Sequence, residues 1–389
     1  GLKPGTDAFV LTKHADINTV VKDPDRFIVM GQRRVNDWAN DGLSGEDVYT
    51  TSRNLMTASM VTLRPTQELY IKHRKELTDP WVGTGASRHR EMIARLANEL
   101  IDEWINDDSV EFISQFARPL PQRVFATILG FPFVDIPQLA EWGDAVVTPF
   151  VHGTGLKHEL APEQASEMFR RLEGFQDYIY EHVRAKRLNP QDDMVSFLCD
   201  VHYQALDRKL TDLEIAGNVH AMIIGALETT QYAIEEQAQM LCENAGLFDT
   251  VRNDRSKLRA FTEESLRMRS PTHGLSTRMT SRDEVFQGVA VPAGSLLHLR
   301  FAAANVDEEE FAYPFDLDLE RHGVTRHLAF SAGPRVCPGA NLSRIEQQVA
   351  WDVLCDRLSS VEYGEGNDWQ HQPGIMLGTL KLNLKFTRT

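Results

Sequence analysis

One of the four cysteines, Cys337, lies in a segment whose neighbours suit a metal-bound thiolate. Gly333 and Arg335 precede it, Gly339 follows it, and the apolar spacing after that predicts a helix beginning at about Ala340. Unpaired N–H groups and the positive dipole end at a helix amino terminus favour a thiolate over a thiol, and Arg335 adds positive charge. The glycines let a flat, bulky ligand approach the backbone. The segment therefore predicts a metal-binding thiolate.

The residues around Cys337 separate this prediction from the alternative of a buried structural cysteine in a turn. Residues 330–339 read Phe-Ser-Ala-Gly-Pro-Arg-Val-Cys-Pro-Gly. They resemble, at every defining position, the Phe-x-x-Gly-x-Arg-x-Cys-x-Gly loop of the cytochrome P450 family of haem-thiolate monooxygenases. The resemblance implies that Cys337 is the iron ligand of haem b, iron protoporphyrin IX, and that Phe330 and Gly339 contact this cofactor.

A second segment, residues 225–230, is similar to the family's pattern of small residues followed by an acid and an alcohol. It reads Gly-Ala-Leu-Glu-Thr-Thr. The resemblance implies that Ala226 lies beside the haem, where it leaves room for dioxygen. It also implies that Glu228 and Thr229 relay the two protons needed to split O–O and form water. The competing interpretation of Glu-Thr-Thr is a solvated helix face.

Glu264 and Arg267 match the family's Glu-x-x-Arg pair, two residues that share one helix face. Their role in the family is structural, and a basic residue from the segment before the cysteine loop joins them. Arg321 is predicted to be this third residue, and His322 is the alternative. A pair on the surface would instead contribute only ~0.3–0.5 kcal/mol.

The two propionates of haem require cations or strong hydrogen-bond donors when they are buried. By resemblance, Arg278 and Arg335 match propionate-binding arginines of bacterial relatives. The third contact is expected from an early helix, in which Arg74 matches the family's basic position. Tyr70 and His73 are the alternatives, and a solvated basic helix face is the competing interpretation.

A largely helical frame must position these residues. Apolar residues spaced by three and four predict amphipathic helices at residues 92–104 and 163–187, and a further helix at 263–269 ends at Ser270-Pro271. A capping box formed by Thr211 and Glu214 begins the clearest helix. No sequence signal stops this helix before about residue 243, which predicts roughly 33 residues and a length of ~50 Å.

Strand signals are short and few. Residues 9–12 and the alternating valines between 285 and 291 predict small strands. We see no internal repeat and no linker rich in Gly, Ser or Pro. The expected fold class is therefore mainly α with small β-sheets (α+β). By resemblance it is the triangular cytochrome P450 fold, a single haem-binding domain over residues 1–389.

Composition excludes several classes of protein. The 389 residues are 42% hydrophobic and 25% charged, which argues against disorder, and a net charge of −15 disfavours nucleic acid as a partner. We find no apolar run of about 18 residues and no secretory signal, so we expect a cytoplasmic protein without a membrane anchor. The sequence has no CxxC pair and no HExxH motif, which argues against a zinc site.

The resemblance implies an oxidoreductase that inserts one atom of O2 into an organic substrate and releases the other as water. Electrons would come ultimately from NAD(P)H through separate proteins, a ferredoxin and its reductase, and we expect a monomer. The family's docking face lies on the cysteine side of the haem, where a local basic concentration would attract an acidic ferredoxin. Its residues are Lys72, His73, Arg74, Lys75, Arg88, His89 and Arg90.

The expected substrate is a hydrophobic small molecule of terpenoid, aromatic or steroid-like type, because the residues that should line the pocket are mostly apolar. By position these are Met222, Ile223, Thr272, Leu275 and Met376. Two other functions remain open: a peroxide-driven haem-thiolate peroxygenase, which would not need the proton relay, and a non-catalytic haem-binding protein.

Overall fold

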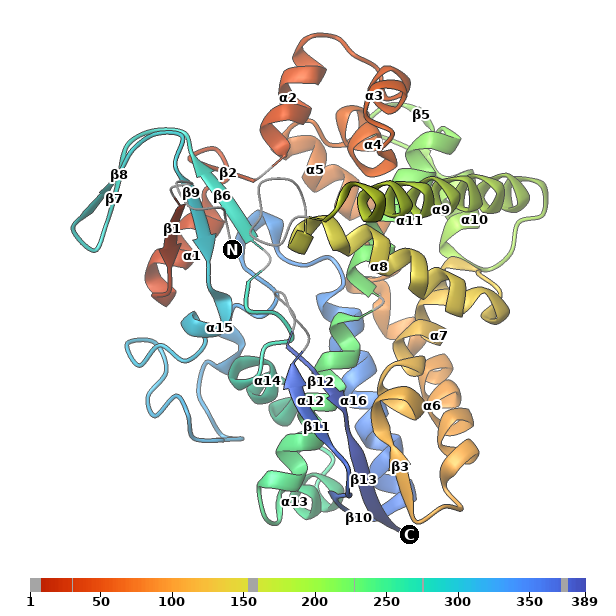
Figure 1. Ribbon diagram of the computed structural model, residues 1–389, viewed down its shortest axis with the longest axis vertical. Coiled ribbons are helices and arrows are strands. Elements are labelled where there is room, and N and C mark those ends of the chain that lie inside the picture. The colour runs from red at the N-terminus through yellow and green to blue at the C-terminus, as the bar shows by residue number, and fades with distance from the viewer. Residues whose placement is uncertain (1–7, 30, 153–159, 227, 275, 372–376) are drawn as a thin grey trace. The chain divides into compact units, whose positions relative to one another are not determined.

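The computed structural model describes the chain except for residues 1–7, 30, 153–159, 227, 275 and 372–376, and it is mainly helical (Figure 1). Five small sheets accompany the helices in the described part of the chain. The predicted fold class, mainly α with small sheets, is confirmed. Among the described residues, no helix is both long enough and apolar enough to cross a bilayer.

The chain gathers into two compact units, each built from segments that are distant in sequence. Residues 9–27, 82–124 and 228–389 form one, which we call the cysteine unit because it contains Cys337. Residues 1–8, 28–81 and 125–227 form the other, which we call the helical unit. The single haem-binding domain expected from the sequence stays a prediction.

The helical unit consists almost entirely of helices. Its elements are α2 (Gln32–Asn40), α3 (Gly45–Ser52), α4 (Leu55–Leu63), α5 (Gln67–His73), η1 (Arg74–Thr78), η4 (Phe133–Asp135), α8 (Ile136–His152), α9 (Pro162–Leu188), α10 (Met194–Asp200), β4 (His202–Tyr203), β5 (Arg208–Lys209) and α11 (Asp212–Ala226). Three elements, β1 (Ala8–Leu11), β2 (Phe27–Val29) and α7 (Pro119–Leu129), each contain a boundary between the units.

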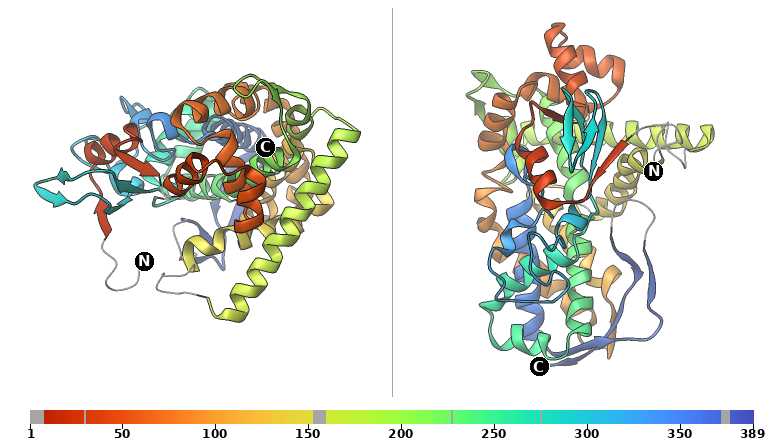
Figure 2. Two further views of the ribbon diagram at one scale, coloured as in Figure 1. Left: turned by 90° about the horizontal axis from the view of Figure 1, so that it is seen from above. Right: turned by 90° about the vertical axis from the view of Figure 1, so that its left-hand side faces the viewer.

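Helix α11 is central to the packing of the helical unit, since it contacts both α4 and α9. It can approach α4 closely because residue 217 is glycine: a Cβ there would lie 2.3 Å from Oγ of Ser59. Helix α9 is 27 residues long and is seen along its length in the left view of Figure 2. The predicted helix at 163–187 is therefore confirmed.

The amino terminus of α11 has the predicted capping box. The N–H of Thr211 donates to the Glu214 carboxylate at 2.9 Å, and the N–H of Glu214 donates to Oγ1 of Thr211 at 3.3 Å. Arg208 also donates to both carboxylate oxygens of Glu214, at 2.7 and 2.8 Å. This carboxylate therefore fixes both the start of the helix and the hairpin before it.

The single helix predicted from residue 211 to about 243 was wrong, because α11 ends at Ala226 and a new helix, α12 (Thr229–Glu243), follows. Glu228 has φ −125° and ψ −38°, outside the helical geometry, and is the N-cap of α12. Gly225 loses more conformational entropy in a helix than any other residue, and the β-branched threonines at 229 and 230 also have low helix propensity. Gly225 and the two threonines flank the interruption, whereas Glu228 itself is a good helix former, so local propensity alone does not explain the break.

The cysteine unit contains most of the strands. Its elements are β1 (Ala8–Leu11), α1 (His14–Lys22), η2 (Thr84–His89), α6 (Arg90–Trp104), β3 (Ser109–Glu111), η3 (Ile113–Ala117), α12, α13 (Leu247–Asn253), α14 (Lys257–Met268), β6 (Ser276–Thr280), β7 (Glu284–Phe286), β8 (Val289–Val291), β9 (Leu296–Leu299), α15 (Phe301–Ala304), η5 (Val324–Arg326), η6 (Gly333–Arg335), α16 (Ala340–Arg357), β10 (Leu358–Tyr363), β11 (Asp368–His371), β12 (Thr379–Lys381) and β13 (Asn383–Arg388).

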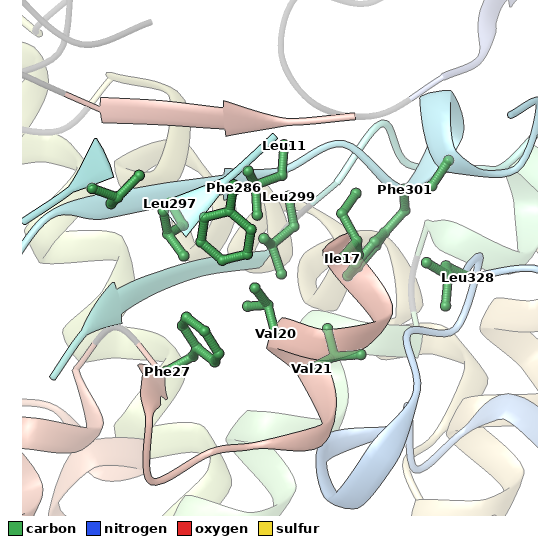
Figure 3. Close-up of a cluster of buried hydrophobic side chains, with 12 residues drawn as sticks. Leu11, Ile17, Val20, Val21, Phe27, Phe286, Leu297, Leu299, Phe301 and Leu328 are labelled. Atoms are coloured by element: carbon green, nitrogen blue, oxygen red, sulfur yellow. The ribbon is translucent and has the colours of Figure 1, made fainter. Parts of the chain in front are cut away.

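The largest sheet has strand order β1-β9-β6-β2, and its core lies between the strands and α1. Figure 3 shows Ile17 and Val20 of α1 pointing toward Leu297 and Leu299 of β9. All four side chains are almost completely buried. Burial of an aliphatic side chain contributes ~1.5–3 kcal/mol, so this cluster is a main support of the sheet. The strands predicted at 9–12 and within 285–291 are confirmed.

Helices α12, α14 and α16 pack against one another and share a buried polar network (Figure 1). The Gln237 side chain on α12 donates to Oγ of Ser265 on α14 and to Oε1 of Gln347 on α16, both at 2.9 Å. Its oxygen accepts from Nε1 of Trp351 at 2.8 Å. One amide therefore links three helices with its polar atoms satisfied.

Glu264 and Arg267 form a buried ion pair on α14, with side chains 1% and 0% exposed. The guanidinium donates to both carboxylate oxygens, at 2.7 and 2.8 Å, and to the carbonyl of Pro314 at 2.6 Å. The basic residue that joins this pair is Arg321, whose Nε lies 3.0 and 3.2 Å from the two oxygens of Glu264. His322 is exposed.

Replacing Arg267 by Ala should lower the free energy of unfolding by ~3–5 kcal/mol, because it breaks a buried ion pair. Glu264 keeps the donors Arg321 and the Asp318 N–H but loses its fully buried guanidinium partner, and the Pro314 carbonyl loses that donor too. The measurement is urea unfolding followed by circular dichroism. Arg170→Ala is the matched control, since Arg170 and Glu167 form an i,i+3 pair with side chains 73% and 42% exposed. We expect no measurable loss for this control, and equal losses in both variants would contradict a structural role specific to the buried pair.

Candidate functional site

Cys337 lies in a short loop between η6 and Gly339, the N-cap of α16. Its N–H donates to the carbonyl of Phe330 at 2.9 Å, which closes the loop on itself. The residue is partly exposed. A Cβ at position 339 would stand 3.9 Å from Sγ, an ordinary van der Waals distance, so this position lies directly beside the sulfur. The loop thus presents the sulfur beside the start of a helix, as predicted from the sequence.

The other cysteines have surroundings that favour the protonated thiol. Burial raises the pKa of Cys199, raises that of Cys242 to about 12 and raises that of Cys355 to about 11. At neutral pH all three remain thiols, and a thiol is a poor metal ligand. Cys337 is therefore the cysteine best suited to bind a metal.

The turn before Cys337 is tightly constrained by α1. Gly333 has φ +69°, a left-handed conformation in which side chains other than glycine are strained. A Cβ at this position would lie 2.6 Å from the carbonyl oxygen of Val21, closer than real Cβ contacts allow. Glycine is thus required here both by the backbone conformation and by the packing against α1.

A buried carboxylate that the sequence analysis missed, Glu263 on α14, holds the cysteine loop from two sides. It accepts from Arg344 of α16, at 2.6 and 3.0 Å, and from Nε2 of His327 at 3.0 Å. Nδ1 of His327 accepts the N–H of Ala329 at 3.2 Å, which places the ring proton on Nε2. The Arg344 guanidinium also lies 4.5 Å from the ring centroid of Phe330.

The ionisation of Glu263 follows from these contacts. Burial by itself would raise its pKa, but the hydrogen bonds from His327 and Arg344 outweigh burial and lower the pKa to about 2. The carboxylate is therefore negative throughout the neutral range. It ties residue 327, ahead of the loop, to residue 344, behind it.

Two predicted propionate contacts lie in the cysteine unit. Arg278, in the middle of β6 opposite Leu297 of β9, is only 4% exposed. Its guanidinium donates to Oγ of Ser276 and to the carbonyl of Thr277. Arg335 is the last residue of η6 and is partly buried. A guanidinium as deeply buried as that of Arg278 suits a carboxylate ligand.

The three alternatives for the remaining propionate contact lie in the helical unit, on α5 and η1. Tyr70 is 8% exposed, and Arg74 lies 3.5 Å from Oδ1 of Asp79. His73 is 1% exposed, and its Nε2 lies 2.5 Å from Oδ1 of Asn218. Burial, followed by nearby arginines, lowers its pKa to about 3. His73 is therefore neutral and its Nε2 is already paired with Asn218, which argues against it; Arg74 is the cationic alternative and Tyr70 the hydroxyl donor.

The predicted proton relay begins α12. Glu228 is its N-cap, Thr229 is its first residue, and both are partly buried. The next residue, Thr230, is buried and donates from Oγ1 to Oγ of Ser343 on α16 at 3.0 Å. The N–H of Ser343 in turn donates to the carbonyl of Gly339 at 2.9 Å. The relay and the cysteine loop are thus linked through adjacent residues.

The remaining predicted site residues are only partly described. Ala226 is the last residue of α11, on which Ile223 is buried and Met222 is partly buried. Thr272, between α14 and β6, is partly buried. Leu275 and Met376 lie outside the described residues.

The donor set around Cys337 fits haem. In the part of the chain that the structure describes, no three His, Cys, Asp or Glu side chains are placed to hold a metal ion together. A porphyrin brings its own four nitrogen ligands, so a single protein thiolate suffices on one face of the iron. A thiolate beside Gly339, with a deeply buried arginine in the same unit, matches this requirement.

Comparison with known proteins gives consistent results. The family model for cytochrome P450 matches residues 158–386. Cytochrome P450 CYP107DY1 of Priestia megaterium is 27% identical over 92% of this chain and 83% of its own length. Cyclomarin C epoxidase CymV of Salinispora arenicola is 28% identical over 98% of this chain and 91% of its own.

Solved structures agree on the fold. The crystal structure of P450BioI in complex with an acyl carrier protein ligated to hexadec-9Z-enoic acid superposes with a TM-score of 0.82. The alignment covers 99% of this chain and 94% of the other, at 24% identity.

Replacing Gly333 by Ala should distort the cysteine loop and lower the haem content of the purified protein. We expect a left-handed strain of ~1–3 kcal/mol together with an overpacking cost of similar size, because the added methyl group meets the Val21 carbonyl. Gly246→Ala is the matched control: its φ is +76°, but a Cβ there meets nothing within 4 Å. The ratio of Soret to protein absorbance is the measurement, and a ratio equally reduced in both variants would contradict the packing argument.

Proposed function

This chain belongs to the cytochrome P450 family, and we propose that it is a haem-thiolate monooxygenase that hydroxylates a hydrophobic small organic substrate with one atom of O2. Its membership makes it an oxidoreductase. The observation that carries the proposal is the loop around Cys337, closed by the hydrogen bond to Phe330 and followed directly by α16. This loop can present a thiolate to one face of a planar cofactor.

When bound, haem supplies the oxidative chemistry. Cys337 would hold the iron and donate electron density to it, as a thiolate does more strongly than a neutral imidazole. Arg278 and Arg335 would bind the propionates, with Arg74 or Tyr70 as the third contact. Phe330, Gly339 and Ala226 would border the ring, where their positions in the family place them.

Glu228 and Thr229 would transfer protons from solvent toward the haem site. The carboxyl group of Glu228 can take up a proton from solvent, since the residue is partly exposed, and the hydroxyl of Thr229 can pass it on. The interruption between α11 and α12 places Glu228 outside regular helical geometry. This frees its side chain from the fixed direction of a helical residue, which suits an acid one methylene longer than the usual Asp.

Electrons would arrive from NAD(P)H through a ferredoxin and its reductase, and the chain would act as a monomer. The predicted basic set is smaller than the sequence suggested: His73 and His89 are buried, and Lys72 is paired with Glu68 at 2.8 Å. Arg88 is exposed on η2, in the same unit as Cys337. It is therefore the best candidate for attracting an acidic partner.

The proposed substrate class is a terpenoid, aromatic or steroid-like compound. Support comes from the buried Ile223 and the partly buried Met222 on α11, which offer an apolar surface. Titration with matched neutral and charged compounds, read by the shift in haem spin state, tests this class. Tightest binding by a charged compound would contradict it.

Carbon monoxide added to the dithionite-reduced protein should give the long-wavelength Soret band of thiolate-ligated carbonyl haem. Cys337→Ala should abolish this band, because no other ligand of the iron would be a thiolate. Cys242→Ala is the control, matched because Cys242 is also only partly buried. It should keep the band, because Cys337 is still present. Absence of haem from the wild-type protein, or survival of the band in Cys337→Ala, would refute the proposal.

Replacing Thr229 by Ala should uncouple oxygen consumption from product formation. We expect product per O2 consumed to fall at least ~10-fold, with hydrogen peroxide released instead, because a positioned proton donor is lost. Thr229→Ser keeps the hydroxyl and should keep the coupling. Turnover driven by added peroxide should be spared in both variants; if the wild-type protein works with peroxide alone, a peroxygenase is the better assignment.

Raising the ionic strength from ~20 to ~200 mM should slow reduction by an acidic ferredoxin several-fold, since exposed charges are screened beyond about a Debye length. Stopped-flow absorbance gives the second-order rate constant. Arg88→Glu should reduce this constant, whereas Arg95→Glu, on the exposed face of α6, should change it much less. A rate constant independent of salt would exclude electrostatic docking.

A further inference from the structure

A cavity of about 590 Å³ lies in the cysteine unit, apart from the residues assigned above to haem and substrate. Residues of η2, α6, α14, η5 and α16 line it. Three of its lining residues are arginines, Arg90, Arg259 and Arg344, and most of the others carry hydroxyl or amide groups. Neither the family's known cofactor nor the proposed proton relay uses this cavity.

The cavity has an excess of positive charge. Its one acidic residue, Glu263, is already engaged by Arg344 and His327. Arg90 is exposed, and its guanidinium donates to the amide oxygen of Gln348 at 3.3 Å. Arg259 is exposed and forms no ion pair with any described residue. Two guanidinium groups therefore face the cavity without a carboxylate partner, in a chain whose net charge is −15.

The helix termini add to this charge. Arg90 is the first residue of α6, Arg259 is the third of α14 and Asn341 is the second of α16, so three first turns contribute to the lining. None of the three N-cap residues makes a side-chain cap hydrogen bond. Backbone N–H groups and positive dipole ends at helix amino termini favour anions.

We propose that this cavity binds a phosphate-bearing small molecule, held by Arg90 and Arg259, while Arg344 stays paired with Glu263. Guanidinium groups match the oxygens of a phosphate in paired hydrogen bonds, and the hydroxyls of Thr84 and Ser87 offer further donors. A single phosphate would fill only part of the volume, which lies in the usual range for small-molecule sites. The volume leaves room for an organic group beside the phosphate.

Calorimetric titration of the purified protein with inorganic pyrophosphate, at constant ionic strength set by sodium chloride, tests the proposal. We expect saturable binding to one site per chain. Arg259→Gln and Arg90→Gln should each raise the dissociation constant by about tenfold, because each removes one charge-assisted contact. Arg95→Gln is the matched control: Arg95 lies on α6, is exposed, pairs with Glu99 at 2.7 Å and does not line the cavity.

Three outcomes would overturn the proposal. The first is the absence of saturable pyrophosphate binding. If Arg259→Gln then also slows reduction by a ferredoxin, the cavity belongs to a protein-docking surface instead. The second is binding weakened equally by Arg95→Gln and Arg259→Gln. The third is binding of citrate as tight as that of pyrophosphate, which would indicate a carboxylate ligand. None of these readouts depends on catalytic turnover.

Discussion

A single buried carboxylate, that of Glu263, connects the loop that presents Cys337 to the helix that follows it. It receives hydrogen bonds from His327, ahead of the loop, and from Arg344, behind it. These contacts lower its pKa to about 2, so the charge that attracts them persists at any physiological pH. Because Arg344 also packs on the ring of Phe330, whose carbonyl accepts the Cys337 N–H, the position of the sulfur depends on this carboxylate.

The next residue on α14, Glu264, is turned about 100° around the helix axis and makes a second set of buried contacts. It binds Arg267 and Arg321, and these arginines in turn hold carbonyl groups of the irregular segment between α15 and η5. Glu264 and its arginines thus hold the irregular segment between α15 and η5, and Glu263 holds the segment at His327 just before the cysteine loop. Irregular chain cannot satisfy its own carbonyl groups, so buried guanidinium groups satisfy them instead.

Much of the site could be predicted from the sequence because its signals are local. The cysteine loop, the Glu264–Arg267 pair and the capping box at Thr211 each involve residues within ten positions of one another, and each pattern permits few alternatives. The clamp around Glu263 had no comparable signal. Its partners lie 64 and 81 residues further along the chain, and a lone Glu beside Glu264 is indistinguishable from a surface acid until the fold is known.

The sequence by itself determined the family and the mainly helical fold class, and it singled out Cys337 as the proposed iron ligand, since each follows from short patterns of residue type and spacing. Only the tertiary structure decided the protonation of His73, which depends on burial by distant helices, and the interruption at Glu228, which local helix propensity does not explain. It also brought Arg90, Arg259 and Arg344 to one cavity. Burial, pairing and convergence of charge depend on which residues are neighbours in space, and short patterns along the sequence do not reveal those neighbours.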